Sequence, residues 1–270
     1  MSIELIAELS MNHLGDKVLI DEMVCAAAHS GAHFAKFQTW KVDNLKSGPW
    51  DNDGRKEDYK KAEMTEEKIS YAIERCNKYD IKFLTSCFYV GDLDLIRSFS
   101  PCVKIPGPES SNKELVEKAI KNFDKVYLST GASDEEEFMK YAKCSNVYLL
   151  HAVSCYPCLD ENVNMKRMLL FKMNTDNIGY SGHMLGINDA ILAISLGAKV
   201  VEKHFTIDRN LPFRDNKFSI LPEEFKKISE YAKDFEKMMI YKGIDHQKCE
   251  DNVRQDYARR WCGKQKEKLC

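Results

Sequence analysis

The stretch Ile178-Gly179-Tyr180-Ser181-Gly182-His183 and, later in the chain, the stretch Val200-Val201-Glu202-Lys203-His204 both end in a histidine. Short apolar runs at 177–181 and 199–205 predict two strands, and the helical spacing of Ala and Leu over 189–196, closed by Gly197, predicts a helix between them. A strand–helix–strand unit places two parallel strands side by side, so His183 and His204 lie at the same end of a sheet and can share one metal ion. The alternative is two unrelated histidines, one in a core and one in a loop.

The same alternation of strand and helix runs through the rest of the chain. Six further apolar runs predict strands at 3–9, 34–38, 81–86, 102–105, 125–129 and 147–152. Helices are predicted at 17–30, after the cap Thr65, and at 112–121, 133–143 with Ser133 as cap, 164–173 and 222–239, with a long polar loop over 40–64. Eight such units predict an α/β fold, a (β/α)8 TIM barrel. A doubly wound open sheet is the alternative, but no Gly-x-Gly-x-x-Gly follows the first strand.

Length and composition allow one large core. The chain has 270 residues, 44% of them apolar, and a net charge of −2 with acidic and basic residues interspersed. We therefore expect a barrel over 1–243 with a basic C-terminal tail over 244–270, and neither a nucleic-acid nor a membrane partner. The absence of a leader and of a long apolar run predicts a cytoplasmic protein.

The ten cysteines are scattered along the chain, which is typical of reduced thiols. Cys155 and Cys158 form a single CxxC without a second pair. This is a weak signal for a metal or redox site.

Polar side chains follow every predicted strand, and in a barrel these strand ends form the active site. Lys36 and Lys104 lie within apolar runs, where a lysine is costly to bury without an anionic partner. With several hydroxyls they predict a basic, donor-rich pocket that suits a phosphate together with a carboxylate. Three carboxylates are available beside the two histidines as a further metal ligand or as acid and base: Glu8, Glu109 and Asp215.

Nine ordered motifs over about 3–225 carry a resemblance to a known family. They are Ala7-Glu8 with Asn12-His13-x-Gly15, Gly31-Ala32-x-x-Ala35-Lys36-x-Gln38-Thr39, Val103-Lys104-Ile105, Leu128-Ser129-Thr130-Gly131, Leu150-His151 with Tyr156-Pro157, Gly179-Tyr180-Ser181-x-His183, Gly197-Ala198, Glu202-Lys203-His204-Phe205-Thr206, and Asp215. On these residues the chain resembles the sialic acid synthases. That family joins phosphoenolpyruvate to an N-acylated hexosamine, such as N-acetylmannosamine or a deoxy-diacetamido relative, to make nonulosonic acids.

The resemblance implies roles for individual residues. It implies phosphoenolpyruvate contacts from Lys36, Ser86, Lys104, Ser129, Ser154 and Ser181. It implies sugar recognition by Glu109, Tyr156 and Asp215, and a carboxylate near the reacting centre at Glu8. It also implies a divalent ion on His183 and His204, with Mn²⁺ first and Mg²⁺ or Co²⁺ as alternatives.

The chain departs from the family pattern at several places; Ser154 replaces the usual asparagine and Ser86 the usual threonine, and both keep a donor. Gly107 stands where a serine hydroxyl is usual, and Gly182 stands where an aspartate usually precedes the metal histidine. The C-terminal antifreeze-like domain, which in the family reaches across a dimer and adds an arginine to the partner's sugar site, is replaced by a basic tail. The chain could therefore act as a homodimer, alone or with a separately encoded antifreeze-like lid protein. Three arginines of the tail are candidates for the missing one: Arg254, Arg259 and Arg260.

Two other functions remain as alternatives. One is a related synthase that joins phosphoenolpyruvate to another aldose, which would need a basic cluster for the sugar phosphate. The other is an inactive barrel that serves as a binding or scaffold subunit. Gly107 and Gly182 favour the inactive barrel, and retention of both histidines and both lysines argues against it.

Overall fold

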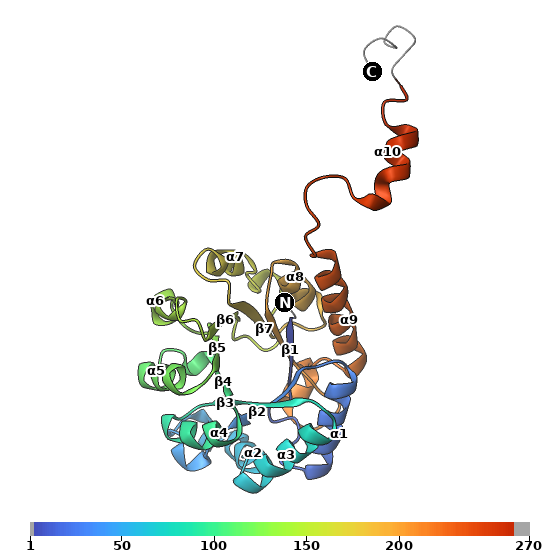
Figure 1. Ribbon diagram of the computed structural model, residues 1–270. Coiled ribbons are helices and arrows are strands. Elements are labelled where there is room, and N and C mark those ends of the chain that lie inside the picture. The colour runs from blue at the N-terminus through green and yellow to red at the C-terminus, as the bar shows by residue number, and fades with distance from the viewer. Residues whose placement is uncertain (1–2, 262–270) are drawn as a thin grey trace. The chain divides into compact units, whose positions relative to one another are not determined.

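The computed structural model describes residues 3–261 and forms a closed parallel barrel in which each strand pairs with the next and β8 pairs with β1 (Figure 1). The strands are β1 Glu4–Glu8, β2 Phe34–Thr39, β3 Lys82–Cys87, β4 Cys102–Ile105, β5 Lys125–Ser129, β6 Val147–His151, β7 Ile178–Gly182 and β8 Val200–His204. The predicted (β/α)8 fold is confirmed, and the open doubly wound sheet is excluded because the sheet has no edge.

The helices lie outside the strands (Figure 1). They are α1 Lys17–His29, α2 Arg55–Ala62, α3 Glu66–Lys78, α4 Leu93–Phe99, α5 Lys113–Asn122, α6 Glu135–Phe138, α7 Lys166–Lys172, α8 Asn188–Ser195, α9 Pro222–Met238 and α10 Asp251–Tyr257. The apolar faces of the barrel helices α1, α3, α4, α5, α7, α8 and α9 and the outward faces of the strands form the main core, whereas α10 belongs to the C-terminal unit and buries no residue. The chain divides into two compact units, 1–236 and 237–270.

Three local expectations need correction. The predicted loop 40–64 contains α2, whose sequence carries almost no apolar stripe and buries only Ala62, so periodicity could not reveal it. The short helix α4 was not predicted either. Asp134, not Ser133, caps α6, because Ser133 instead donates to the carbonyl oxygen of Gly107 (3.2 Å) while Asp134 forms a capping box with Glu137.

The barrel interior is filled by one apolar layer contributed by alternate residues of the strands: Ile6, Phe34, Leu84, Tyr127, Leu150 and Val200. Because side chains alternate across a strand, the residues two positions further along also point inward, at the carboxyl end of the barrel. The site is built on this second, polar layer.

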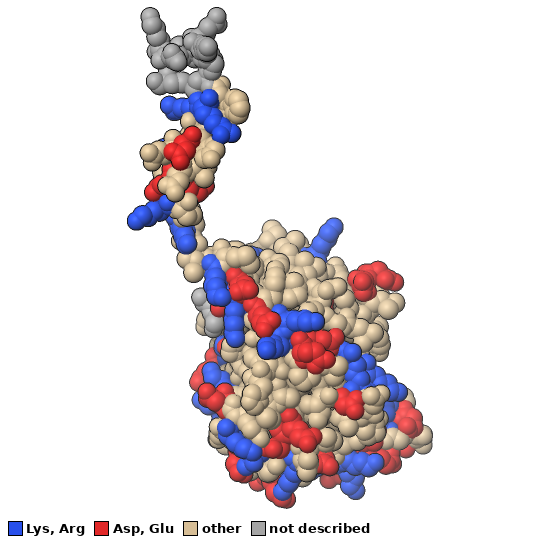
Figure 2. Space-filling model, turned by 90° about the vertical axis from the view of Figure 1, so that its right-hand side faces the viewer, with Lys and Arg blue, Asp and Glu red and all other residues tan. Residues whose placement is uncertain are grey.

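The surface agrees with the predicted charge pattern. On the face that Figure 2 shows, Lys and Arg are interspersed with Asp and Glu over the barrel. Within residues 3–261, no helix is both long enough and apolar enough to cross a membrane. All eight described cysteines, including Cys155 and Cys158, are free thiols, and Cys262 and Cys270 lie outside the described residues.

Candidate active site

Four charged side chains form a buried network at the carboxyl end of the barrel. Lys36 on β2 forms an ion pair with Glu8 on β1, and its Nζ lies 2.9 Å from the hydroxyl of Ser86 on β3. Lys104 on β4 donates to Oε1 of Glu202 on β8 at 2.9 Å, and the same oxygen lies 3.6 Å from Lys36. All five side chains are at least nine-tenths buried. Burial explains why each lysine has a carboxylate partner.

Glu202 is the functional residue that sequence reasoning missed. Its Oε1 also accepts a hydrogen bond from Ser181 on β7 (3.0 Å), whereas its Oε2 is buried without a hydrogen-bond partner among the described residues. Burial opposes the charge of Glu202, but Lys104 and Lys36 lower its pKa below its usual range. The alternation of β8 could have revealed it, since Glu202 and His204 must share one face.

The sequence had suggested a basic pocket, but the pocket in the structure is not basic. Two lysines face two glutamates, so their formal charges cancel. Burial lowers the pKa of Lys36 well below its usual range, and Glu202 opposes that effect. A phosphate entering this layer would have to compete with Glu202 for the lysine ammonium groups.

Ser129 belongs to the same layer. It follows Tyr127 by two residues on β5 and therefore shares the inward face of that strand, and its side chain is buried. The structure thus brings together on inward faces the residues Glu8, Lys36, Ser86, Lys104, Ser129, Ser181 and His204.

His183 and His204 lie beside each other at the ends of β7 and β8, with ring centroids 5.5 Å apart. Burial lowers the pKa of His183 to about 4, and burial with the nearby His183 and lysines lowers the pKa of His204 well below its usual range. Both rings are therefore neutral at pH 7, the state in which imidazole binds a metal. The alternative that the two histidines lie apart, one in a core and one in a loop, is excluded by this proximity.

The pair fits a divalent ion in two respects. The Nδ1 of His183 lies 2.7 Å from the carbonyl oxygen of Val153, which fixes the ring and leaves the other nitrogen free, and the buried Nδ1 of His204 has no hydrogen-bond partner among the described residues. The proximity of the two rings would allow His183 and His204 to hold one ion together. Within residues 3–261, no group of three or more His, Cys, Asp or Glu side chains could hold a metal.

Asp215 connects the histidines to the buried network. It lies in the loop after β8, where its Oδ2 is 4.0 Å from Nδ1 of His204 and accepts a hydrogen bond from Ser10 at 2.8 Å. The backbone N–H of Ser10 in turn donates to Glu8 at 2.6 Å. Burial raises the pKa of Asp215, and hydrogen bonds from Ser10 and Arg214 oppose that rise. Asp215 is thus a buried carboxyl next to His204.

Tyr156 covers the histidines from the loop after β6. Its ring lies 4.2 Å from His183 and 5.4 Å from Phe218, centroid to centroid, while 43% of the residue is exposed. An aromatic ring that is half open to solvent beside a polar site is suited to binding the apolar face of a sugar.

Ser154 follows β6 and Glu109 follows β4, on either side of β5. Ser154 is half-buried against Gly107, in the loop after β4, and Gly131, in the loop after β5. Glu109 is half-buried in the short turn after β4 and accepts a long hydrogen bond from the amide of Asn112 (3.5 Å). Neither residue has a hydrogen bond or ion pair with the network of Glu8, Lys36, Lys104 and Glu202 in the described structure.

Two residues that the sequence places at strand ends point away from the site. Lys203 lies on the outward face of β8, where its Nζ is 2.8 Å from Asp189 on α8. His151 lies on the outward face of β6, with Nε2 2.7 Å from the carbonyl oxygen of Val163. Both orientations follow from the alternation of side chains along a strand, since Lys203 lies between the inward Glu202 and His204, and His151 follows the inward Leu150.

Gly107 is a structural requirement in this chain. A Cβ at this position would collide with the carbonyl oxygen of Gly131 and lie 3.2 Å from the hydroxyl of Ser154. Two other hydroxyls, of Ser110 and Ser133, hydrogen-bond to the Gly107 carbonyl at 2.7 and 3.2 Å. The β4 loop therefore packs so closely on the β5 loop that a serine side chain does not fit there.

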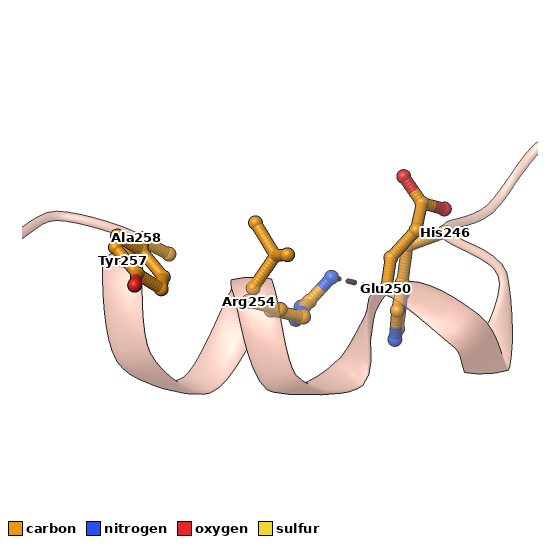
Figure 3. Close-up of a pocket in the computed structure, with 6 residues that line it drawn as sticks. His246, Glu250, Arg254, Tyr257 and Ala258 are labelled. Atoms are coloured by element: carbon orange, nitrogen blue, oxygen red, sulfur yellow. Dashed lines mark hydrogen bonds between the residues drawn. The ribbon is translucent and has the colours of Figure 1, made fainter.

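A shallow groove in the C-terminal unit contains none of the predicted residues except one arginine. Figure 3 shows the side chains that line it on and before α10, among them His246, Glu250 and Tyr257. Arg254 points along the helix toward His246, with Nη1 2.9 Å from Nδ1. Arg260 lies over the rings of Tyr257 and Trp261. A role for Arg254, Arg259 or Arg260 in a sugar site stays a prediction.

Comparison with known proteins gives a consistent result. The model of the NeuB family matches residues 23–243. The N,N'-diacetyllegionaminic acid synthase of Legionella pneumophila is 33% identical over 93% of this chain and 76% of its own length, and a pseudaminic acid synthase of Campylobacter jejuni is 31% identical over 83% and 71%. The crystal structure of an N-acetylneuraminic acid synthetase from Leptospira borgpetersenii superposes with a TM-score of 0.85 at 28% identity, covering 96% of this chain and 93% of that one.

Two phospho-2-dehydro-3-deoxyheptonate aldolase structures from Thermotoga maritima share the fold at 16% identity, with TM-scores of 0.68 and 0.66. At that identity they speak for the barrel alone. The family model, in contrast, covers residues 23–243, which include Lys36, Lys104 and Glu202 of the buried network and both histidines. The chain therefore belongs to the NeuB family, a family of enzymes whose named members here are nonulosonic acid synthases.

Proposed function

We propose that this chain condenses phosphoenolpyruvate with an N-acylated hexosamine, N-acetylmannosamine or a deoxy-diacetamido relative, to give a nonulosonic acid and phosphate. The observation that carries the proposal is the pairing of two neutral histidines with two buried lysines at one mouth of the barrel. The lysines are close enough to His204 to contribute to the lowering of its pKa. The two lysines suit the anionic groups of phosphoenolpyruvate, and the two histidines suit the aldehyde of the sugar.

Binding of phosphoenolpyruvate would draw on the inward layer. Lys36 and Lys104 would turn from Glu202 toward the phosphate and carboxylate, and the hydroxyls of Ser86 and Ser181 would add neutral donors. Glu202 keeps an oxygen without a hydrogen-bond partner and would remain behind the lysines as their counterion. The carboxylates of Glu8 and Glu202 therefore balance the charge of the two lysines when no substrate is bound.

The sugar would lie against the exposed side of the Tyr156 ring, next to the histidines, with Asp215 beside its reacting end. A divalent ion on His183 and His204, Mn²⁺ in the first instance, supplies Lewis acidity to the aldehyde when bound. The enol carbon C3 forms the new bond to the aldehyde carbon, water adds to C2, and phosphate leaves from C2. Asp215, with its raised pKa, would give a proton to the alkoxide oxygen formed from the aldehyde. Glu8 would take the proton of the attacking water.

The test is phosphate release from phosphoenolpyruvate with Mn²⁺, measured across a panel of N-acetylmannosamine and its deoxy-diacetamido relatives. We expect release with one sugar and none in the His204→Ala variant. Release that needs a different aldose would favour the related phosphoenolpyruvate–aldose synthases. No release with any sugar, although metal and phosphoenolpyruvate bind, would favour an inactive barrel or the need for a separate lid domain. Addition of an antifreeze-like domain in trans separates the last two.

A further inference from the structure

One buried carboxylate outside the barrel wall has no role in the chemistry proposed above. Asp189, in the first turn of α8, is 3% exposed. Its Oδ1 accepts hydrogen bonds from the backbone N–H of Ala190 (2.8 Å) and from Lys203 (3.0 Å), and its Oδ2 accepts from Lys203 (2.8 Å) and from the hydroxyl of Tyr180 (2.9 Å). Both oxygens are satisfied, so this carboxylate is locked in one position.

The partners of Asp189 lead directly to the two histidines. Lys203 precedes His204 in β8, and besides Asp189 its Nζ reaches the carbonyl oxygen of Met184 at 2.8 Å. Met184 follows His183. A single lysine therefore ties the segment after one histidine to the strand that carries the other, and Asp189 neutralises that lysine.

The position of Asp189 also accounts for Gly182. A Cβ added at Gly182 would collide with Oδ2 of Asp189 and lie 2.5 Å from a ring carbon of Tyr180. Gly182 pairs with Lys203 in the sheet, so a side chain at 182 would point at the same ammonium group. The carboxylate from α8 thus occupies the volume, and contacts the lysine, that an acidic side chain at 182 would otherwise have.

We infer that Asp189 is the positioning residue for the histidine pair: it holds Lys203, and through Lys203 the spacing of His183 and His204, in place of a side chain at position 182. The inference rests on the proposed metal site at the two histidines. It concerns geometry outside the barrel wall, because Asp189 does not touch substrate or metal. Loss of such a supporting partner typically weakens metal binding by about 10–100-fold.

The test is Mn²⁺ affinity of the full chain, measured from the free Mn²⁺ signal in electron paramagnetic resonance, beside thermal unfolding of each variant. We expect Asp189→Asn to raise the Kd about 10–100-fold. Gly182→Asp alone should also weaken binding, because two carboxylates then crowd one lysine. The double variant Gly182→Asp/Asp189→Ala moves the carboxylate to β7 and frees the ring of Tyr180, so it should restore a Kd within about threefold of wild type.

Glu4 offers a matched control at the opposite end of the barrel. It accepts from Lys125 (2.7 Å) and from the hydroxyl of Tyr127 (2.8 Å), the same pair of donor types that serve Asp189. Glu4→Gln should lower thermal stability and leave Mn²⁺ affinity unchanged. If Asp189→Asn binds Mn²⁺ as wild type does, or if Glu4→Gln weakens binding equally, the inference fails.

Two outcomes separate this inference from the proposed function. If Asp189→Asn does not fold, the double variant decides: restored affinity supports a positioning carboxylate, and a folded double variant with weak binding refutes it. If the wild-type chain binds no Mn²⁺, or if the His204→Ala variant binds Mn²⁺ as tightly as the wild type does, the proposal of a metal site at the two histidines is wrong. Asp189 then has no positioning role.

Discussion

Two buried lysine–carboxylate pairs lie on opposite faces of the same strand, β8. On the inner face Glu202 is shared by Lys104 and Lys36, and one of its oxygens has no hydrogen-bond partner in the described structure. On the outer face Asp189 holds Lys203 with both oxygens satisfied. The difference shows how a fold separates support from chemistry. The outer pair is complete and fixed, whereas the inner pair keeps unused bonding capacity for a ligand.

Removal of the outer cation should have the largest effect on stability. Lys203→Met leaves Asp189 charged and buried with only Tyr180 and a backbone N–H, so we expect the free energy of unfolding to fall by about 3–5 kcal/mol. Denaturant titration measures this. Lys78→Met, at a half-exposed lysine 3.6 Å from Asp21, is the control and should cost less than about 1 kcal/mol. Equal losses in the two variants would remove the distinction between the two faces.

Removal of the inner cation should affect activity instead. In Lys104→Met, Glu202 still has Lys36 and Ser181 as partners, so we expect stability to change by less than about 1.5 kcal/mol. We expect kcat/KM for phosphoenolpyruvate to fall by about 10²–10³, since one preorganised donor to the phosphate or carboxylate is lost. Steady-state phosphate release measures it, with Lys118→Met at the surface as control. A stability loss as large as that of Lys203→Met would contradict the comparison.

Adjacent hydroxyls on β7 give a finer version of the same test. Tyr180→Phe removes a donor to Asp189 and should lower the free energy of unfolding by about 1–2 kcal/mol without changing KM. Ser181→Ala removes a donor to Glu202 and should raise the KM for phosphoenolpyruvate several-fold, with a loss of stability below about 1 kcal/mol. Denaturation and kinetics on both variants separate the faces. If Tyr180→Phe raised the KM and Ser181→Ala lowered the stability instead, the assignment of Tyr180 to the outer face and Ser181 to the inner face would be wrong.

The smallest expected effect is a pH dependence on the outer face of β6. Burial lowers the pKa of His151 to about 4, so the folded state holds it neutral while the unfolded chain takes up a proton near pH 6.5. The contribution of His151 to the free energy of unfolding is therefore fully present above pH 6.5 and is lost as the pH falls toward 4. Between pH 7 and pH 6 we expect this residue to account for less than about 1 kcal/mol. His151→Gln should reduce the decline, and an unchanged pH profile of unfolding would exclude this origin.

The barrel was readable from the sequence because its strands are short apolar runs separated by capped helices. Thr65 and Asn112 cap α3 and α5 as their residue types predict. The helix α2 was not predicted, because Ala62 is its only buried residue. Periodicity reports burial, so a polar helix on the surface gives no signal.

The site was predicted less completely, for a reason of geometry. Lys36 and Lys104 were expected to need anionic partners, but the partner Glu202 belongs to a strand distant in sequence from both, and only barrel closure brings it to them. The contact of Asp189 with the position of the missing side chain at Gly182 was not predicted, because nothing in a single sequence relates a helix residue to a glycine on a strand. Contacts between distant elements are the part that spacing and composition do not encode.

The tight packing of Gly107 on the carbonyl of Gly131 also constrains how this chain can change. A serine at position 107 would collide with the backbone of the loop after β5. The substitution would therefore need a compensating movement of that loop. A Gly107→Ser substitution made alone would therefore report the strain between the two loops as well as the effect of the added hydroxyl. Grafting both loops as one unit is the route by which specificity could be transferred.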